Sequence, residues 1–284
     1  MGYQKSREVS KIYLENASLP KHAESYTVIP HKFVIDNVIE NLNSSNYTIK
    51  KETYICNQGG NVAQGIYHLA PLNYNSSDQD PDIGIMFAWT NSYDKSIRFQ
   101  CSVGAYVFLS SSNIVGGEIN FARKHTGTAD LEIISQIESQ ILGSVNTFKN
   151  IVNDKNELKK ITLSKREQAE LIGRLYYEKD ILEPSQLSMI KDEMKKSSFN
   201  YNVSNDNAWA LYNHVTLALK KTHPRSWLYN SKEFHKFITT ELLSNTNINT
   251  KDTYNVIDVN NVDLESNSVS VNIDAIIENP SFEL

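Results

Sequence analysis

The spacing of apolar residues changes along this chain, and that change constrains the fold more than any other feature. In the segments 83–90 (IGIMFAWT) and 97–103 (IRFQCSV), large apolar residues occupy every second position. Such alternation predicts β-strands, because successive side chains of a strand point to opposite faces. The segment between them, 91–96 (NSYDKS), is rich in turn-forming residues. We therefore expect an antiparallel hairpin with one apolar and one polar face.

From Ala129 onward the apolar residues follow helical spacing instead. Thr128 is a suitable N-cap, and Asp130 and Glu132 lie in the first turn, where acidic side chains stabilise a helix. The sequence predicts one long helix of about six turns, lying across the sheet. Its expected apolar stripe comprises Leu131, Ile134, Ile137, Ile141, Val145, Phe148 and Val152.

The other periodic segments complete the prediction of an α+β fold. A helix is expected at 31–42 and further strands at 47–56, 61–70 and 105–111. The second half predicts helices, one of them beginning with a capping box between Ser164 and Glu167. The others are expected at 185–197, 205–221 and 231–243, with a non-helical link at 222–230. Together these elements predict an antiparallel sheet of four or five strands, covered by helices on one face and followed by a C-terminal helical subdomain.

Composition divides the chain into four predicted parts. These are a polar N-terminal arm (1–24), an α+β sheet domain (25–153), a helical subdomain (154–243) and an acidic, Asn-rich tail (244–284). Residues 251–284 contain one basic residue, Lys251, and seven acidic ones. Such a segment is typical of a mobile or partner-binding tail. Its alternating piece SVSVNIDAII also leaves open the pairing of strands.

Signatures of several function classes are missing from the sequence. The glycine-rich pieces NQGGN and IVGGEIN lack the lysine or the third glycine of nucleotide-binding loops, and no GxSxG motif occurs. The seven histidines include no pair spaced i, i+4, and there is no CxxC, so we expect no metal site. Asp78, Asp80 and Asp82 alternate, but without the glycine and glutamate positions of a calcium loop, so they predict an acidic surface loop. We expect no cofactor and no catalytic residue, which favours a non-enzymatic protein while leaving the question open.

Cysteine use and hydropathy indicate the compartment. Cys56 and Cys101 lie in expected strands, far apart in sequence, so buried free thiols in a reducing cytoplasm are expected. Apolar runs are shorter than the roughly 18 residues that span a bilayer, and the first ten residues are polar, unlike a signal peptide. We therefore expect a cytoplasmic protein without a membrane partner.

Basic residues gather at a few positions although the net charge is −5. Arg123, Lys124 and His125 directly precede the expected long helix, whose backbone N–H groups would favour an anion. Further cations fall on strands or hairpin turns of the predicted sheet, namely Lys50, Lys51, Lys95 and Arg98. These seven residues could line one groove for nucleic acid, with Tyr93 and Tyr106 as stacking surfaces for unpaired bases. The alternative is that they are the solvated face of an antiparallel sheet and an ordinary turn.

Four motifs follow one another over about residues 25–240, namely IPHKFVIDNVIENL, TNSYDKSIRFQCSVGAYVFLSSSNIV, ARKHTG and NAWALYNHVT. Their order resembles a phage- and plasmid-borne family called domain of unknown function 932. The chain departs from that pattern by having Tyr93 for histidine, Lys95 for glycine, Val103-Gly104 for an asparagine, and His214 for a small residue. The resemblance implies a mobile genetic element, most simply a phage, and hence the cytoplasm of a host cell.

A sheet with a long helix and basic residues at the helix start is also similar, at the level of fold, to phage single-strand annealing proteins. That similarity implies a homo-oligomer that holds single-stranded DNA during recombination or replication. Two alternatives remain open at this point. One is a counter-defence or host-takeover protein that binds a host or phage protein, and the other is a protein that binds a nucleotide or another small ligand.

Overall fold

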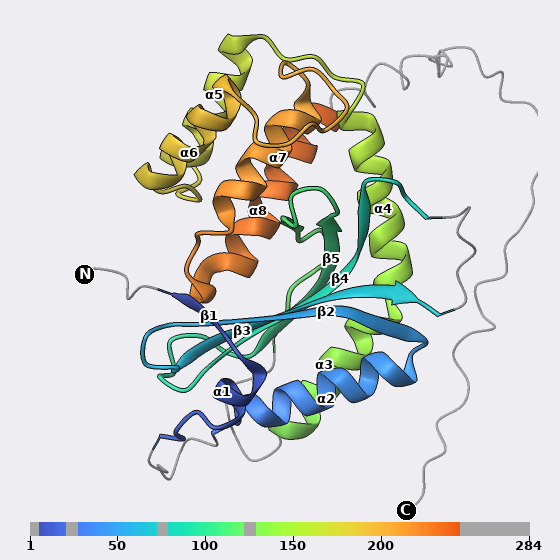
Figure 1. Ribbon diagram of the computed structural model, residues 1–284, viewed down its shortest axis with the longest axis vertical. Coiled ribbons are helices and arrows are strands. Elements are labelled where there is room, and N and C mark those ends of the chain that lie inside the picture. Colours follow the sequence, from blue (N-terminus) through green and yellow to red (C-terminus); the bar gives the residue numbers. More distant parts are fainter. Residues whose placement is uncertain (1–5, 21–27, 73–78, 122–128, 245–284) are drawn as a thin grey trace, which may run out of the picture.

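The computed structural model describes residues 6–20, 28–72, 79–121 and 129–244 (Figure 1). Strands and helices follow the order β1-α1-α2-β2-β3-β4-β5-β6-β7-α3-α4-α5-α6-α7-α8. The strands are β1 (Arg7–Val9), β2 (Tyr47–Cys56), β3 (Val62–Pro71), β4 (Ile83–Ser92), β5 (Gln100–Val107), β6 (Asn113–Ile114) and β7 (Asn120–Phe121). The helices are α1 (Lys11–Glu15), α2 (His31–Ser44), α3 (Ala129–Leu142), α4 (Ser144–Leu158), α5 (Lys165–Tyr177), α6 (Pro184–Lys195), α7 (Ala208–Leu219) and α8 (Pro224–Leu243).

The described strands form one antiparallel sheet in the order β1-β2-β3-β4-β5-β6, with β7 also paired to β5. The expected hairpin is present as β4 and β5, in which Phe87 pairs with Val103 and Trp89 with Cys101. The α+β fold class is therefore confirmed, with more strands than the four or five expected. The extra strands are short, and β1 lies within the segment that the sequence marks as a polar arm.

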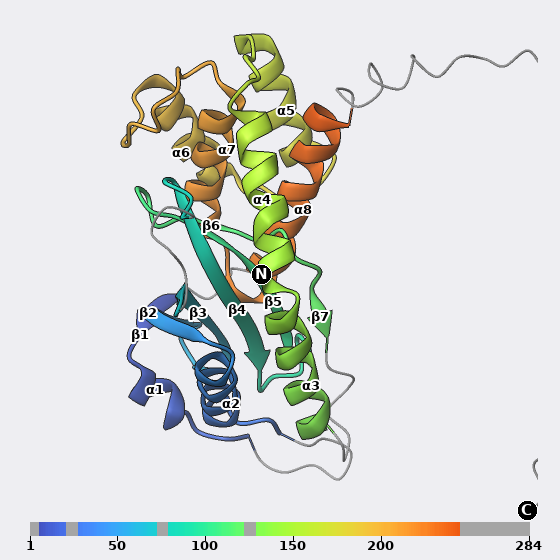
Figure 2. The same cartoon turned by 90° about the vertical axis from the view of Figure 1, so that its right-hand side faces the viewer.

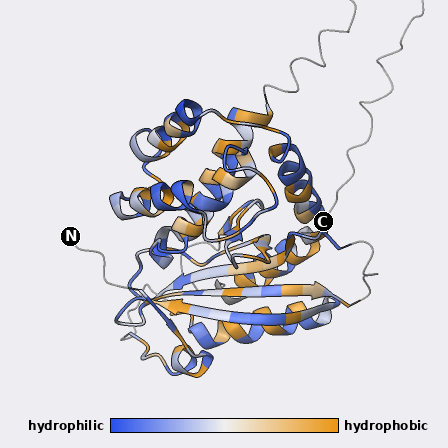
Figure 3. Cartoon of the chain, turned by 45° about the horizontal axis from the view of Figure 1, so that its top comes forward, coloured by the Kyte–Doolittle hydropathy of each residue, from blue (hydrophilic) through white to orange (hydrophobic). Residues whose placement is uncertain are grey.

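Helices cover both faces of the sheet, whereas the sequence predicts one covered face (Figures 1 and 2). On one face, α2 and α3 pack against Phe87, Trp89 and Val103 in the larger sheet core. On the other face, Trp227 and Leu228 of α8 pack against Met86 and Ala88. The expected polar face of the hairpin is consequently buried as well, and Thr90 and Ser102 are inaccessible to solvent. Hydrophobic residues accordingly run along the strands and the inner sides of the helices (Figure 3).

The predicted long helix is divided at Gly143 into α3 and α4, which follow one another alongside β5 (Figure 2). The predicted stripe is wrong in part, because Leu131 is 70% exposed and Val145 is 45% exposed. The buried positions are instead Ile133, Ile137, Ile141, Ser144, Ile151, Lys155 and Leu158. The face changes because α3 packs on α2 and β5, whereas α4 packs on β5, α7 and α8.

The helical half contains α5 to α8, and the predicted boundary between residues 153 and 154 falls inside α4. The capping box is confirmed, since Ser164 Oγ accepts from the Glu167 amide and Glu167 accepts from the Ser164 amide. The non-helical link predicted at 222–230 is wrong, because α8 begins at Pro224 with His223 as its N-cap. Proline at the first helical position needs no N–H partner, so it starts this helix.

Two further expectations concern the cysteines and the membrane. Cys56 and Cys101 are both free and buried, as expected. Among the residues that the structure describes, none of the helices has the length and apolar composition needed to cross a bilayer.

His31 is fully buried, and its two ring hydrogen bonds indicate the neutral tautomer that carries its proton on Nε2. Its Nε2–H donates to the carbonyl of Gly60 at 3.1 Å, so Nδ1 accepts from the Asn91 amide, also at 3.1 Å. The ring stacks on Tyr93 with centroids 3.9 Å apart. Burial lowers the pKa of His31 from 6.5 to about 4, because the charged form would lose its hydration.

This histidine predicts a loss of stability on acidification. Since the unfolded chain binds the proton near pH 6.5 and the folded chain only near pH 4, the free energy of unfolding should fall as the pH falls through this window. The expected slope is up to about 1.4 kcal/mol per pH unit. Urea unfolding at several pH values, compared with the variant His31→Gln, measures it. Identical pH dependence in both proteins would contradict the prediction.

Candidate functional site

A pocket of about 690 Å³ lies between the second face of the sheet and the helices above it. Its floor is formed by β2 and β3, whose residues Lys51, Thr53, Ile66 and His68 point to the same side. The corner between α7 and α8 forms the opposite wall, and β1 and the start of α6 close the ends. The volume is within the range of about 300–1,000 Å³ that is common for ligand pockets.

The pocket carries an excess of positive charge. Lys51 of β2 and Lys220 and Lys221, which follow α7, line it together with Arg7 of β1. Partial burial lowers the pKa of Lys220, and repulsion from Lys51 and Lys221 lowers it further. The only acids among its lining residues are Glu8 and Glu183. A site in which neighbouring ammonium groups repel each other is stabilised by an anion placed between them.

An aromatic pair lies beside these lysines. His68 and Tyr106 stack with ring centroids 3.8 Å apart and an angle of 3° between the planes. Their strands, β3 and β5, are separated by β4, so the rings meet above Gly84, where a Cβ atom would lie 2.6 Å from the Tyr106 ring. His68 Nε2 lies 3.3 Å from Asn113 Oδ1. Burial, with a contribution from Lys51 and Lys220, lowers the pKa of His68 to about 4, so the ring is neutral at pH 7.

The residues predicted from the sequence are only partly brought together. Lys51 lines the pocket, and Lys50 is its exposed neighbour at a β-bulge of β2. Lys95 and Arg98 are exposed in the loop between β4 and β5. That loop reaches the start of α8, because Asp94 lies 3.4 Å from Arg225, two residues after the pocket residue His223.

Arg123, Lys124 and His125 lie outside the described residues. The last described residue before them, Phe121, pairs with Gln100 in β5, two residues from Arg98. The expected role of Thr128 as a helix cap likewise concerns a residue that the structure does not describe.

The two tyrosines predicted to stack on bases differ in exposure. The prediction is wrong for Tyr93, which is 4% exposed because it is covered by His31 and accepts a hydrogen bond from the His31 amide at 2.7 Å. Tyr106 is partly buried and belongs to the aromatic pair described above.

Two lysines of the helical wall, Lys220 and Lys221, are absent from the residues predicted from the sequence. They belong to the basic run LKKTHPR, residues 219–225, which looks like an ordinary helix end. A basic run directly before a proline is a usable signal, since both the end of α7 and the start of α8 fall there. The basic run does not indicate that Lys51 of β2 lies on the other side of the same pocket.

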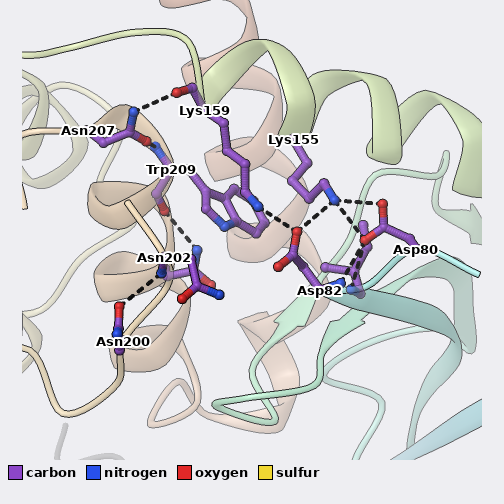
Figure 4. Close-up of polar contacts among 10 residues, drawn as sticks. Asp80, Asp82, Lys155, Lys159, Asn200, Asn202, Asn207 and Trp209 are labelled. Carbon is purple, nitrogen blue, oxygen red and sulfur yellow. Dashed lines mark hydrogen bonds and ion pairs between the residues drawn. The ribbon is translucent and has the colours of Figure 1, made fainter. Parts of the chain in front are cut away.

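Asp80 and Asp82, between β3 and β4, have a structural role instead of the predicted surface position, whereas Asp78 lies outside the described residues (Figure 4). Lys155 of α4 donates to Asp80 at 2.6 Å and to Asp82 at 2.9 Å, and Lys159 donates to Asp82 at 2.6 Å. Burial raises the pKa of Asp82, but the hydrogen bonds from the two lysines outweigh it and leave that pKa below its usual value. The side chains of Asp80 and Lys155 are nearly inaccessible, so the prediction of an exposed loop is wrong for these residues.

Within the described ranges, no three His, Cys, Asp or Glu side chains are grouped closely enough to hold a metal ion. Comparison of the chain with protein-family models, with curated proteins and with solved structures finds no match. The site is therefore interpreted from its own chemistry.

Proposed function

We propose that this protein binds single-stranded DNA through the basic pocket, without catalysing a reaction. The observation that carries the proposal is the convergence of Lys51, Lys220 and Lys221 on one pocket. Across the described parts of the chain, none of these three ammonium groups forms an ion pair, whereas Lys155, Lys159 and Arg174 do. Positive charge left uncompensated in a pocket favours binding of phosphate groups, with release of their counterions.

Single strands suit the pocket better than a duplex does. The lysines lie near the stacked pair of His68 and Tyr106, in which Tyr106 is the more exposed ring, so phosphates and an unstacked base could be bound at neighbouring points. A pocket of about 690 Å³ can enclose a nucleotide or two but is too small for a double helix. Lys50, Lys95, Arg98 and the basic segment at Arg123–His125 would extend the path of the strand.

The expected binding is tight at low salt and weakens steeply as salt is added. For single strands, each phosphate contact contributes about −0.7 to the slope of log K against log salt. The variant Lys51→Gln/Lys220→Gln/Lys221→Gln should therefore lose about two units of slope and bind roughly 100-fold more weakly at low salt. Fluorescence anisotropy of a labelled oligothymidine measures both quantities.

Lys160→Gln is the matched control, because this exposed lysine follows α4 and is paired with Glu157, away from the pocket lining. It should leave the affinity within about twofold. The proposal fails if the protein does not bind at low salt, or if the triple variant retains both affinity and slope. Substitution of Arg123 and Lys124 tests separately whether the basic segment takes part.

A nucleotide or another small phosphorylated ligand is the second candidate, favoured by the partial enclosure of the pocket. A saturable thermal shift with a mononucleotide, absent with oligonucleotides, would support it. A third outcome is that the protein binds one host protein in stoichiometric amount and has no affinity for DNA. That outcome would support a role in counter-defence or host takeover.

The resemblances described from the sequence extend the proposal. They support a phage protein of the host cytoplasm that acts as a homo-oligomer in recombination or replication. In that setting the helices α5 to α8 would be the surface for self-association. Measurement of the oligomeric state by light scattering, with and without oligonucleotide, addresses this part.

A further inference from the structure

The negative charge of the chain is concentrated at one end. Residues 245–284 contain one Lys and seven Asp or Glu, whereas residues 1–244 contain 27 Lys and Arg against 26 Asp and Glu. The last forty residues therefore carry a charge of −6, and the rest of the chain, at +1, is close to neutral. The basic pocket has the opposite charge to this acidic segment, because its lining includes Arg7, Lys51, Lys220 and Lys221.

The position of α8 places the acidic segment within reach of the pocket. His223 and Trp227, at the start of α8, line the pocket, and the helix ends 20 residues later at Leu243. A helix of this length is about 30 Å long. An extended chain spans up to about 3.3 Å per residue, so roughly ten residues can return over that distance. The acids from Asp258 onward lie far enough along the chain to arrive at the pocket.

We infer that the acidic segment Asp258–Glu283 binds in the basic pocket of its own chain and competes there with nucleic acid. Carboxylates near Lys51, Lys220 and Lys221 would relieve the repulsion among these ammonium groups. Several cations elsewhere in the described residues, among them Lys155, Arg174 and Lys232, already have carboxylate partners, whereas the pocket brings together three lysines that form no ion pair there. Covalent linkage supplies the segment at an effective concentration in the millimolar range, which compensates for weak individual contacts.

The competition rests on the proposed function, but occupation of the pocket can be tested without nucleic acid. Carbodiimide treatment of the full-length protein joins carboxylates to lysine amines that touch them, and peptide mass spectrometry identifies the pairs. We expect links from the acidic segment to Lys51, Lys220 or Lys221. Links only to lysines remote from the pocket, such as Lys160 and Lys165, or no links from the segment, would overturn the inference.

Two full-length variants with equal changes in net charge test the competition. The tail variant is Asp258→Asn/Asp263→Asn/Glu265→Gln, and the control is Glu40→Gln/Glu138→Gln/Glu170→Gln, which changes exposed acids of α2, α3 and α5. The tail variant should bind oligothymidine about fivefold more tightly at low salt, and the gain should vanish at high salt. The control should change affinity by less than about twofold.

The outcomes separate the two proposals. Cross-links to the pocket without any oligonucleotide binding by the tail variant would support occupation of the pocket by the acidic segment, and would refute both the competition and the proposed function. Oligonucleotide binding that is equal in the tail variant and the control, together with no cross-links to the pocket, would support the proposed function and refute the inference.

Discussion

Replacement of Lys155 by methionine is expected to lower the free energy of unfolding by about 3–5 kcal/mol, which corresponds to a fall in Tm of roughly 10 °C. Lys155 is 2% exposed and its ammonium donates to both Asp80 and Asp82. Methionine has a similar length, so the substitution removes the charge and leaves little cavity. The nearly buried carboxylate of Asp80 then loses the cation that compensates for its lost hydration. Urea unfolding followed by circular dichroism measures the effect.

Two comparisons isolate the buried charge as the cause. Lys160→Met removes an exposed lysine paired with Glu157 and should cost less than about 1 kcal/mol. The triple variant Lys155→Met/Asp80→Asn/Asp82→Asn removes the uncompensated charge and should recover part of the loss. A loss below about 1 kcal/mol for Lys155→Met would show that water reaches these groups and that the ion pairs stabilise little.

Replacement of Gly104 by alanine is the second substitution with a large expected effect, a loss of about 3 kcal/mol. Gly104 lies in β5 between β4 and β6, and a Cβ atom there would lie 1.9 Å from the carbonyl oxygen of Ile114. The obstacle is backbone of the paired strand β6, so no rotation of a side chain can relieve it. The strand β6 must move away from β5, which would disturb the packing beneath α8. The midpoint and slope of urea unfolding give the loss.

The matched control is Gly173→Ala in α5. A Cβ atom at Gly173 meets nothing within 4 Å, so this substitution should raise stability by about 0.5–1 kcal/mol through the lower conformational entropy of the unfolded chain. Equal changes in the free energy of unfolding for Gly104→Ala and Gly173→Ala would contradict the prediction. They would mean that the backbone of β6 leaves room for a Cβ atom at position 104.

Local signals explain which parts of the fold were predictable. The alternation in residues 83–90 is a property of a single strand, and the Ser164–Glu167 capping box is a property of a single helical turn. Both can therefore be recognised from neighbouring residues. The prediction of one long helix over residues 129–152 was half right, because the pattern indicates helix but does not show which of Ile133 and Ile134 faces inward. Adjacent apolar residues fit two faces of a helix, and only the neighbouring elements select one of them.

Contacts between distant segments explain why the site was found only in part. Lys51 was predicted because it lies on a strand, but Lys220 and Lys221 come about 170 residues later and meet it only through the turn from α7 to α8. Tyr93 was predicted to be exposed because its own segment is a turn. The ring of His31, 62 residues earlier, covers it.

Local sequence patterns predict the type and approximate limits of most elements, the α+β class, the two free cysteines and the concentration of negative charge at one end. These properties depend on residues within one or two turns or strands of each other, or on composition alone. Tertiary contacts are needed to show that α8 covers the second face of the sheet, that Asp80 and Asp82 hold α4, and that the lysines of β2 and of the α7–α8 turn share one pocket. Burial and charge pairing depend on which surfaces meet in space, and a local pattern specifies a surface without specifying its partner.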